Sequence, residues 1–142
     1  MTKQKIEGSL KGLLSDKEYL EQMSSVIPAE LGKEFVLILK SEEISMAKGV
    51  SLSLGLFISR IDSLPDASRA NGRCKEVEVL LSRSNPKGLL REQLKGEFIG
   101  RIPEMQMRHF KAIVTRQRLK VYEATSIATL LLVDYFKGHN KR

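Results

Sequence analysis

The sequence predicts an all-α fold, a compact bundle of about five to six helices. Apolar residues recur at steps of three and four along much of the chain, which is the spacing of one helix face. Ser, Pro and Gly stand at points where helices usually begin and end. Trp is absent and aromatic residues make up 6% of the chain. Leu, Ile, Val and Met therefore supply most of the core, which suits helix packing.

Length and composition predict one domain over residues 1–142, with a short basic tail at 138–142. A chain of 142 residues is long enough to bury a core of its own. Its hydrophobic content of 42% and charged content of 29% are typical of a soluble globular protein. No internal repeat and no linker between domains is apparent.

The first half of the chain is predicted to form three helices. Ser15 and Glu18 make a capping box that begins a helix, and Pro28 ends it. Residues 28–40 fit either a helix or a buried strand, and a helix is favoured because a single strand has no evident partner. Residues 42–63 are apolar on nearly every side in their second half, so we expect them to form a buried central helix.

Two shorter helices are predicted next. An Asn-Gly turn at 71–72 precedes a helix that begins near Cys74. The Ser-Asn-Pro sequence at 84–86 caps a helix over 86–99, which Gly100 ends.

The last element is predicted to be one long helix over 103–137, begun by Pro103 and closed by Gly138. About 35 residues at 1.5 Å each give a helix about 50 Å long. Two alternatives stay open: a new helix capped near Thr125, or a strand in the alternating residues 118–125. One helix is favoured because its apolar stripe keeps one phase through Met107, Phe110, Val114, Gln117, Val121, Ala124, Ala128, Leu131 and Tyr135.

The net charge of +7 is concentrated in the second part of the chain. Residues 1–82 have a net charge of −1, whereas residues 83–142 have a net charge of +8. Residues 108–120 hold five Lys or Arg and no carboxylate. Such an asymmetry favours a polyanionic partner, with nucleic acid, DNA or RNA, as the first expectation.

We therefore expect a nucleic-acid-binding protein that contacts the phosphate backbone with little sequence preference. Acidic groups from the N-terminal part could instead neutralise the basic residues in the fold. The sequence does not support a helix-turn-helix, a ribbon-helix-helix or a zinc finger. The expected phosphate contacts are Lys87, Arg91, Lys95, Arg101, Arg108, Lys111, Arg116, Arg118 and Lys120.

The alternative is a helical interaction or assembly module, in which the stripe of the last helix is a seam for a homodimer or for another helical protein. The seam would consist of Val121, Ala124, Ala128, Leu131 and Tyr135.

The residues that carry chemistry are few. His109 and His139 are the two histidines, and Cys74 is the one cysteine, so no structural zinc set is expected. No glycine-rich phosphate loop is present either. We expect no catalytic residues, no metal and no cofactor. A lone cysteine and the lack of a long apolar segment favour a cytoplasmic or nuclear protein outside the membrane.

Overall fold

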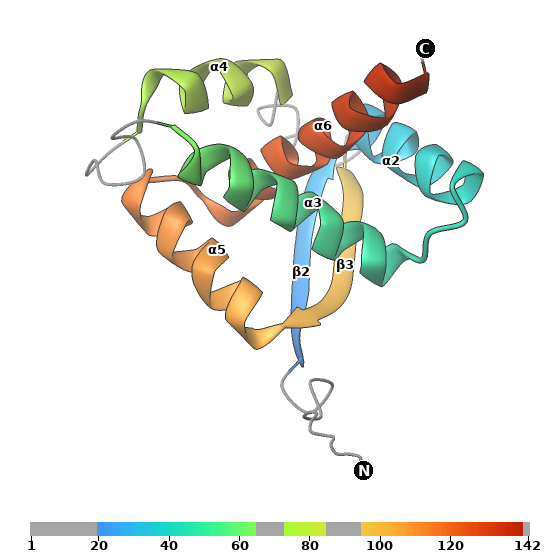
Figure 1. The fold of residues 1–142 in the computed structure, drawn as a ribbon, viewed down its shortest axis with the longest axis horizontal. Helices are drawn as coiled ribbons and strands as arrows, with labels where there is room; N and C mark the ends of the chain where they lie inside the picture. The colour runs from blue at the N-terminus through green and yellow to red at the C-terminus, as the bar shows by residue number, and fades with distance from the viewer. Residues whose placement is uncertain (1–19, 65–72, 85–94, 141–142) are drawn as a thin grey trace.

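The computed structural model describes residues 20–64, 73–84 and 95–140. These residues form five helices and two strands (Figure 1). The helical character is confirmed, but an all-α fold is wrong, because two segments pair as an antiparallel sheet. In chain order the elements are β2 (Leu20–Pro28), α2 (Ala29–Ser41), α3 (Met46–Asp62), α4 (Lys75–Ser84), β3 (Lys95–Pro103), α5 (Glu104–Arg116) and α6 (Val121–Asn140).

The strand–helix–helix order occurs twice in the chain. In the first unit β2, α2 and α3 begin at residues 20, 29 and 46; in the second unit β3, α5 and α6 begin at residues 95, 104 and 121. Each start in the second unit is thus 75 positions beyond its equivalent, and both the strands and the first helices have equal lengths. The chain therefore contains an internal repeat with a strand–helix–helix order, neither of which the sequence analysis had predicted.

The two strands form a ribbon that is symmetric about its centre. Leu20 pairs with Pro103, and Pro28 pairs with Lys95. Because Lys95 is equivalent to Leu20 and Pro103 to Pro28, exchanging the two strands leaves the register unchanged. The central pair is Ser24 and Ile99. We infer from this register that the two units are related by an approximate two-fold rotation through the ribbon.

The core lies between the inner face of the ribbon and the second helix of each unit. In Figure 1, α3 and α6 cross the ribbon, and α4 lies away from it against α6. Met23 and Ile27 of β2 and Phe98 and Ile102 of β3 are buried on this inner face. The ring of Phe98 stacks on Phe35 with centroids 5.7 Å apart.

Residues 20–28 are a strand, so the predicted helix ending at Pro28 is wrong over these residues. Met23 and Ile27 are buried while Gln22 and Ser24 are exposed, which is the alternation of a half-buried strand. Pro28 does not end a helix. It precedes α2, just as Pro103 precedes α5, and each proline stands at the N-cap position. The expected capping box at 15–18 lies outside the described residues.

The predicted helix over 86–99 is also wrong from residue 95, where β3 begins, and its earlier part lies outside the described residues. Each strand is the other's partner, and 75 positions separate them. The preference for a helix over 28–40 is confirmed by α2. The central helix is confirmed as α3, with its start at Met46. The helix near Cys74 is confirmed as α4.

The single helix over 103–137 is wrong, because α5 ends at Arg116 and α6 begins at Val121. The break lies at 117–120 and therefore precedes the Thr125 alternative. Met107 and Val114 before the break and Ala128 after it are all buried in the same core. The apolar residues that suggested one long helix thus belong to two separate helices, and both helices bury them in the same core.

Candidate nucleic-acid interface

The outer face of the ribbon is exposed, and three outward side chains of each strand lie in its central part. Strand residues alternate between the two faces, so the neighbours of the buried positions point outward. Ile99 at the centre is 37% exposed. In register, the outward pairs are Gln22 with Arg101, Ser24 with Ile99, and Val26 with Glu97.

A cluster that we call the basic turn, residues 116–120, joins α5 to α6. It holds Arg116, Arg118 and Lys120, of which the last two are exposed. Arg118 has a positive φ of 55°. Its carbonyl oxygen accepts a hydrogen bond of 2.7 Å from an Nη of Arg73, so the turn is held from the segment before α4. The Lys120 amide donates to the Glu123 carboxylate at 2.8 Å, which closes the start of α6.

The basic turn lies beside β2. Ser25 of β2 and Thr125 of α6 share a hydrogen bond of 3.0 Å between their hydroxyl groups. Lys120 directly precedes α6 and is therefore about 7.5 Å of helix rise from Thr125. The first turn of α6 is thus fixed against the ribbon, and this contact brings the basic turn to its flank.

The opposite flank of the ribbon carries an acidic turn, residues 41–45, which joins α2 to α3. Glu42 and Glu43 are both exposed there. The start of α3 lies against β3: a Cβ placed on Gly100 would be 2.9 Å from the Cα of Ala47. The two flanks of the ribbon therefore differ in charge.

The carboxylate of Glu123 contacts the basic turn, but it accepts from the Lys120 amide and pairs with no cationic side chain of the turn. Within the three described ranges, Arg101, Lys111 and the side chains of Arg116, Arg118 and Lys120 form no ion pair with a carboxylate. Arg108 pairs with Glu104, one turn earlier in α5, at 3.3 Å. Other described carboxylates lie beside other side chains. For example, Asp62 Oδ2 lies 3.0 Å from His109 Nε2.

The structure places the described members of the predicted phosphate contacts in three parts of the fold. Arg116, Arg118 and Lys120 come together in the basic turn, and Arg101 lies on the outer face of the ribbon. Arg108 and Lys111 are exposed along α5, one or more helical turns before the basic turn. Lys95 is the first residue of β3, and of its side chain nothing is described. Lys87 and Arg91 lie outside the described residues.

The expected partner-helix seam is not one exposed face. Ala124 and Ala128 are fully buried and Leu131 is 6% exposed, all within the core of this chain. Val121 and Tyr135 are each 46% exposed. Three of the five seam residues are therefore already packed against the chain itself.

Sequence reasoning missed the outward-facing residues of the ribbon, such as Gln22, Ser24 and Ile99. The signal that could have found it is the Ile-Pro pair, which occurs at 27–28 and again at 102–103. At both places alternating residues precede the proline and a helical pattern follows it. Two such junctions at one spacing indicate a repeated strand–helix unit.

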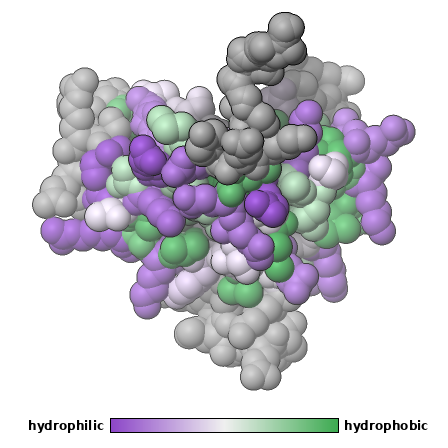
Figure 2. Space-filling model, turned by 90° about the horizontal axis from the view of Figure 1, so that it is seen from below, coloured by the Kyte–Doolittle hydropathy of each residue, from purple (hydrophilic) through white to green (hydrophobic). Residues whose placement is uncertain are grey.

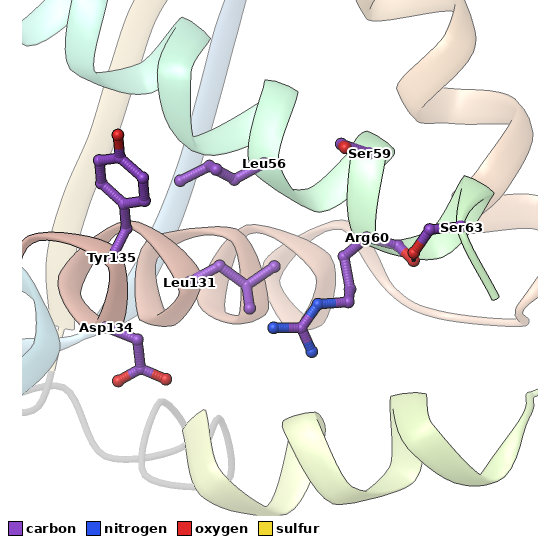
Figure 3. A pocket seen from close by; sticks show the side chains of 7 residues that line it. All are labelled: Leu56, Ser59, Arg60, Ser63, Leu131, Asp134 and Tyr135. Atoms are coloured by element: carbon purple, nitrogen blue, oxygen red, sulfur yellow. Dashed lines mark hydrogen bonds between the residues drawn. The ribbon is translucent and has the colours of Figure 1, made fainter. Parts of the chain in front are cut away.

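A pocket of about 380 Å³ lies where the two units meet (Figure 3). Leu56 of α3 and Leu131 of α6, which are equivalent residues, both line it. Its two charged residues are held by α4: Arg60 donates to Glu76 at 2.8 Å, and Asp134 accepts from Arg83 at 2.7 Å. The lining consists of Leu56, Ser59, Arg60, Ser63, Leu131, Asp134 and Tyr135.

A second hollow, of about 600 Å³, lies beside α2 and includes the exposed side chain of Leu37. Neither hollow is lined by a His or Cys residue. Cys74 has a free thiol, and its amide donates to the Gln117 side chain at 3.0 Å. Across the part of the chain that is described, no group of three or more His, Cys, Asp or Glu side chains is placed to hold a metal ion.

One side of the molecule is polar over much of its described area (Figure 2). Figure 2 shows one side on which hydrophilic residues predominate, with smaller hydrophobic patches between them. In the described ranges no single helix is long and apolar enough to cross a membrane. The helices α2 and α3, which meet at a bend of 114°, would be long and apolar enough only when taken together.

Comparisons with protein-family models, with curated proteins and with solved structures found no match to this chain.

Proposed function

We propose that this protein binds double-stranded DNA, with the outer face of the ribbon in the major groove and the basic turn on the adjacent phosphates. The observation that carries the proposal is the exposed, two-stranded ribbon with a basic turn at its flank. The sequence predicted a phosphate-binding surface, and the proposal adds the ribbon as the part that would enter a groove.

The dimensions of the ribbon support this mode of binding. The major groove of B-DNA is about 12 Å wide and admits a two-stranded ribbon, whose strands lie about 4.8 Å apart. Nine residues per strand span about 30 Å, which is close to one turn of the duplex. Several known DNA-binding proteins use a β-ribbon in this way.

The same dimensions favour DNA over double-stranded RNA. The major groove of A-form RNA is deep and narrow, and side chains cannot read it. A ribbon that carries outward side chains on both strands therefore has no equivalent site there.

The residues divide into two roles. Arg118 and Lys120 are exposed cations without a carboxylate partner among the described residues, and they suit phosphate contact. Arg101 and Gln22 lie side by side on the ribbon and suit base edges, because an arginine recognises guanine and a glutamine recognises adenine.

The test is fluorescence anisotropy with labelled duplex DNA, single-stranded DNA and duplex RNA at about 50 to 200 mM salt. We expect the tightest binding to duplex DNA, weakening steeply as salt rises. The double variant Arg118→Glu, Lys120→Glu should bind at least tenfold more weakly, with a slope of log affinity against log salt reduced by about 2.

The matched control is Arg108→Glu, Lys111→Glu, which changes the net charge by the same amount on α5. It should lose clearly less affinity than the basic-turn variant. Equal losses in the two variants would mean that net charge alone drives binding. Absence of salt-dependent binding to duplex DNA would refute the proposal.

A further inference from the structure

The two units present the same backbone to a ligand but different side chains. On the outer face of the ribbon, Gln22 is equivalent to Glu97, Ser24 to Ile99, and Val26 to Arg101. No outward position of this set carries the same residue in both units. A ligand that meets the ribbon thus meets a symmetric shape with asymmetric chemistry.

The chemistry of the outward side chains differs between the two ends of the ribbon. At one end the outward pair is Gln22 and Arg101, which offers hydrogen-bond donors. At the other end the outward pair is Val26 and Glu97, which offers a methyl surface and an acceptor. Each of these pairs is two residues from the central pair, or about 6.6 Å along the strand.

The turns on the two flanks of the ribbon also share a backbone conformation and differ in charge. Glu43 and Arg118 occupy equivalent positions and have φ values of 57° and 55°. The acidic turn beside β3 carries Glu42 and Glu43, whereas the basic turn beside β2 carries Arg118 and Lys120. Phosphates on the two sides of a bound groove would therefore be attracted on one flank and repelled on the other.

We infer that a single chain recognises a non-palindromic duplex DNA site and binds it in one orientation, an inference that rests on the proposed function. In dimeric DNA-binding proteins the symmetry of the site mirrors the two-fold symmetry of the protein. Here one chain supplies both halves of the ribbon. The target therefore needs neither a second chain nor an inverted repeat.

The side chains assign a class of bases to each end. Arg101 and Gln22 match the major-groove edges of guanine and adenine, so that end selects purines on the strand it faces. Glu97 accepts from the amino group of cytosine, and Val26 contacts the methyl group of thymine, so the other end selects pyrimidines on the opposite strand, to which the two-fold relation of the units turns it. Because those pyrimidines pair with purines, one strand then carries purines at both ends, and the site differs from its own reverse complement. This readout adds sequence preference to the backbone binding that the sequence alone predicts.

The first experiment selects binding sites for the full chain from a random duplex DNA library. We expect an enriched motif that differs from its own reverse complement, with one chain per duplex by analytical ultracentrifugation. The variants Arg101→Ala and Glu97→Ala should each relax the preference at a different end of the motif, by about tenfold for the affected base pair.

The outcomes separate the inference from the proposed function. A palindromic motif, or two chains per site, would overturn the inference and leave DNA binding intact. Salt-dependent binding without any enriched motif would do the same. If no duplex in the library binds, the proposed function fails and the inference fails with it.

A second variant tests the charge difference between the flanks. Glu43→Arg places at position 43 the residue that its equivalent Arg118 already carries in the same backbone conformation. It should bind its selected site about tenfold more tightly near 0.1 M salt and steepen the salt slope by about 1. The matched control is Glu76→Arg on α4, away from the ribbon. Equal effects of the two variants would place the acidic turn away from the DNA backbone and would overturn the orientation.

Discussion

Glu43 and Arg118 adopt the same left-handed backbone conformation, one residue after the cap of α2 and of α5. The hydrogen bonds around them also match. The amides of Glu43 and Arg118 donate to the carbonyls of Lys40 and Thr115, each at 3.2 Å. The next amides reach back to Leu39 and Val114. Both helices thus end in a Schellman motif, and in both the position usually held by glycine is held by a charged residue.

Glu43→Gly and Arg118→Gly should each stabilise the protein. A left-handed conformation costs a residue with a Cβ about 1–2 kcal/mol, while glycine loses about 0.5–1 kcal/mol of chain entropy. The expected net gain is about 0.5–1 kcal/mol in the free energy of unfolding, measured by urea denaturation. Glu42→Gly is the control, because Glu42 has a φ of −96° and gains no such relief. A loss of stability in both glycine variants would contradict the strain at these turns.

Gly49→Ala should destabilise the protein, although alanine usually strengthens a helix. A Cβ on residue 49 would lie 2.6 Å from a methyl carbon of Leu39. Overpacking of this kind costs about 1–3 kcal/mol. In the second unit the equivalent residues are Ala124 and Val114. Alanine there takes the place of glycine, and its neighbour is the smaller valine in place of leucine. We therefore expect Gly49→Ala, Leu39→Val to recover most of the lost stability in thermal and urea unfolding.

The control for that experiment is Gly55→Ala, in the same helix. Among the described residues, a Cβ there has one neighbour within 4 Å, the side-chain amide nitrogen of Gln106 at 3.6 Å. It should stabilise α3 by up to about 1 kcal/mol, because alanine is the better helix former. If Gly49→Ala were as stabilising as Gly55→Ala, the close packing of α2 against α3 would be disproved.

Lys48→Glu should stabilise the start of α3. At this helix the Ser45 hydroxyl accepts from the Lys48 amide at 3.2 Å, and at α6 the Glu123 carboxylate accepts from the Lys120 amide. Each unit thus has one half of a capping box. Glutamate at position 48 completes the box in the first unit and suits the helix dipole, with an expected gain of about 0.5–1 kcal/mol. Lys48→Ala separates this gain from mere removal of the lysine, and equal stabilities of the two variants would exclude the second half of the box.

The sequence predicted the helices better than it predicted the two strands and their pairing. α2, α3 and α4 follow from local periodicity and caps, which residues nearby in the chain determine. The strands do not, because β2 finds its partner 75 positions away, and Pro28 alone is as compatible with the end of a helix as with the start of one.

The repeat was hidden because the two units share few identical residues. Ile27, Pro28 and Phe35 match Ile102, Pro103 and Phe110, and all six of these residues are buried or stand at the strand–helix junction. The exposed positions have diverged, even to opposite charge at Glu43 and Arg118. Net charge led to the expectation of a polyanionic partner, which stays a prediction, whereas the ribbon face depends on a pairing that composition does not reveal.

Leu131→Asp should unfold the protein and should not merely separate an assembled pair of chains. Leu131 is 6% exposed and lies in the core of this chain, so burying a carboxylate there removes packing and leaves a charge without water. The expected loss is at least about 3 kcal/mol in the free energy of unfolding, measured by circular dichroism during urea denaturation. Tyr135→Asp, at a seam position that is 46% exposed, is the matched variant and should keep the fold. A folded Leu131→Asp variant that changes only from dimer to monomer in ultracentrifugation would instead restore the seam as an interface between chains.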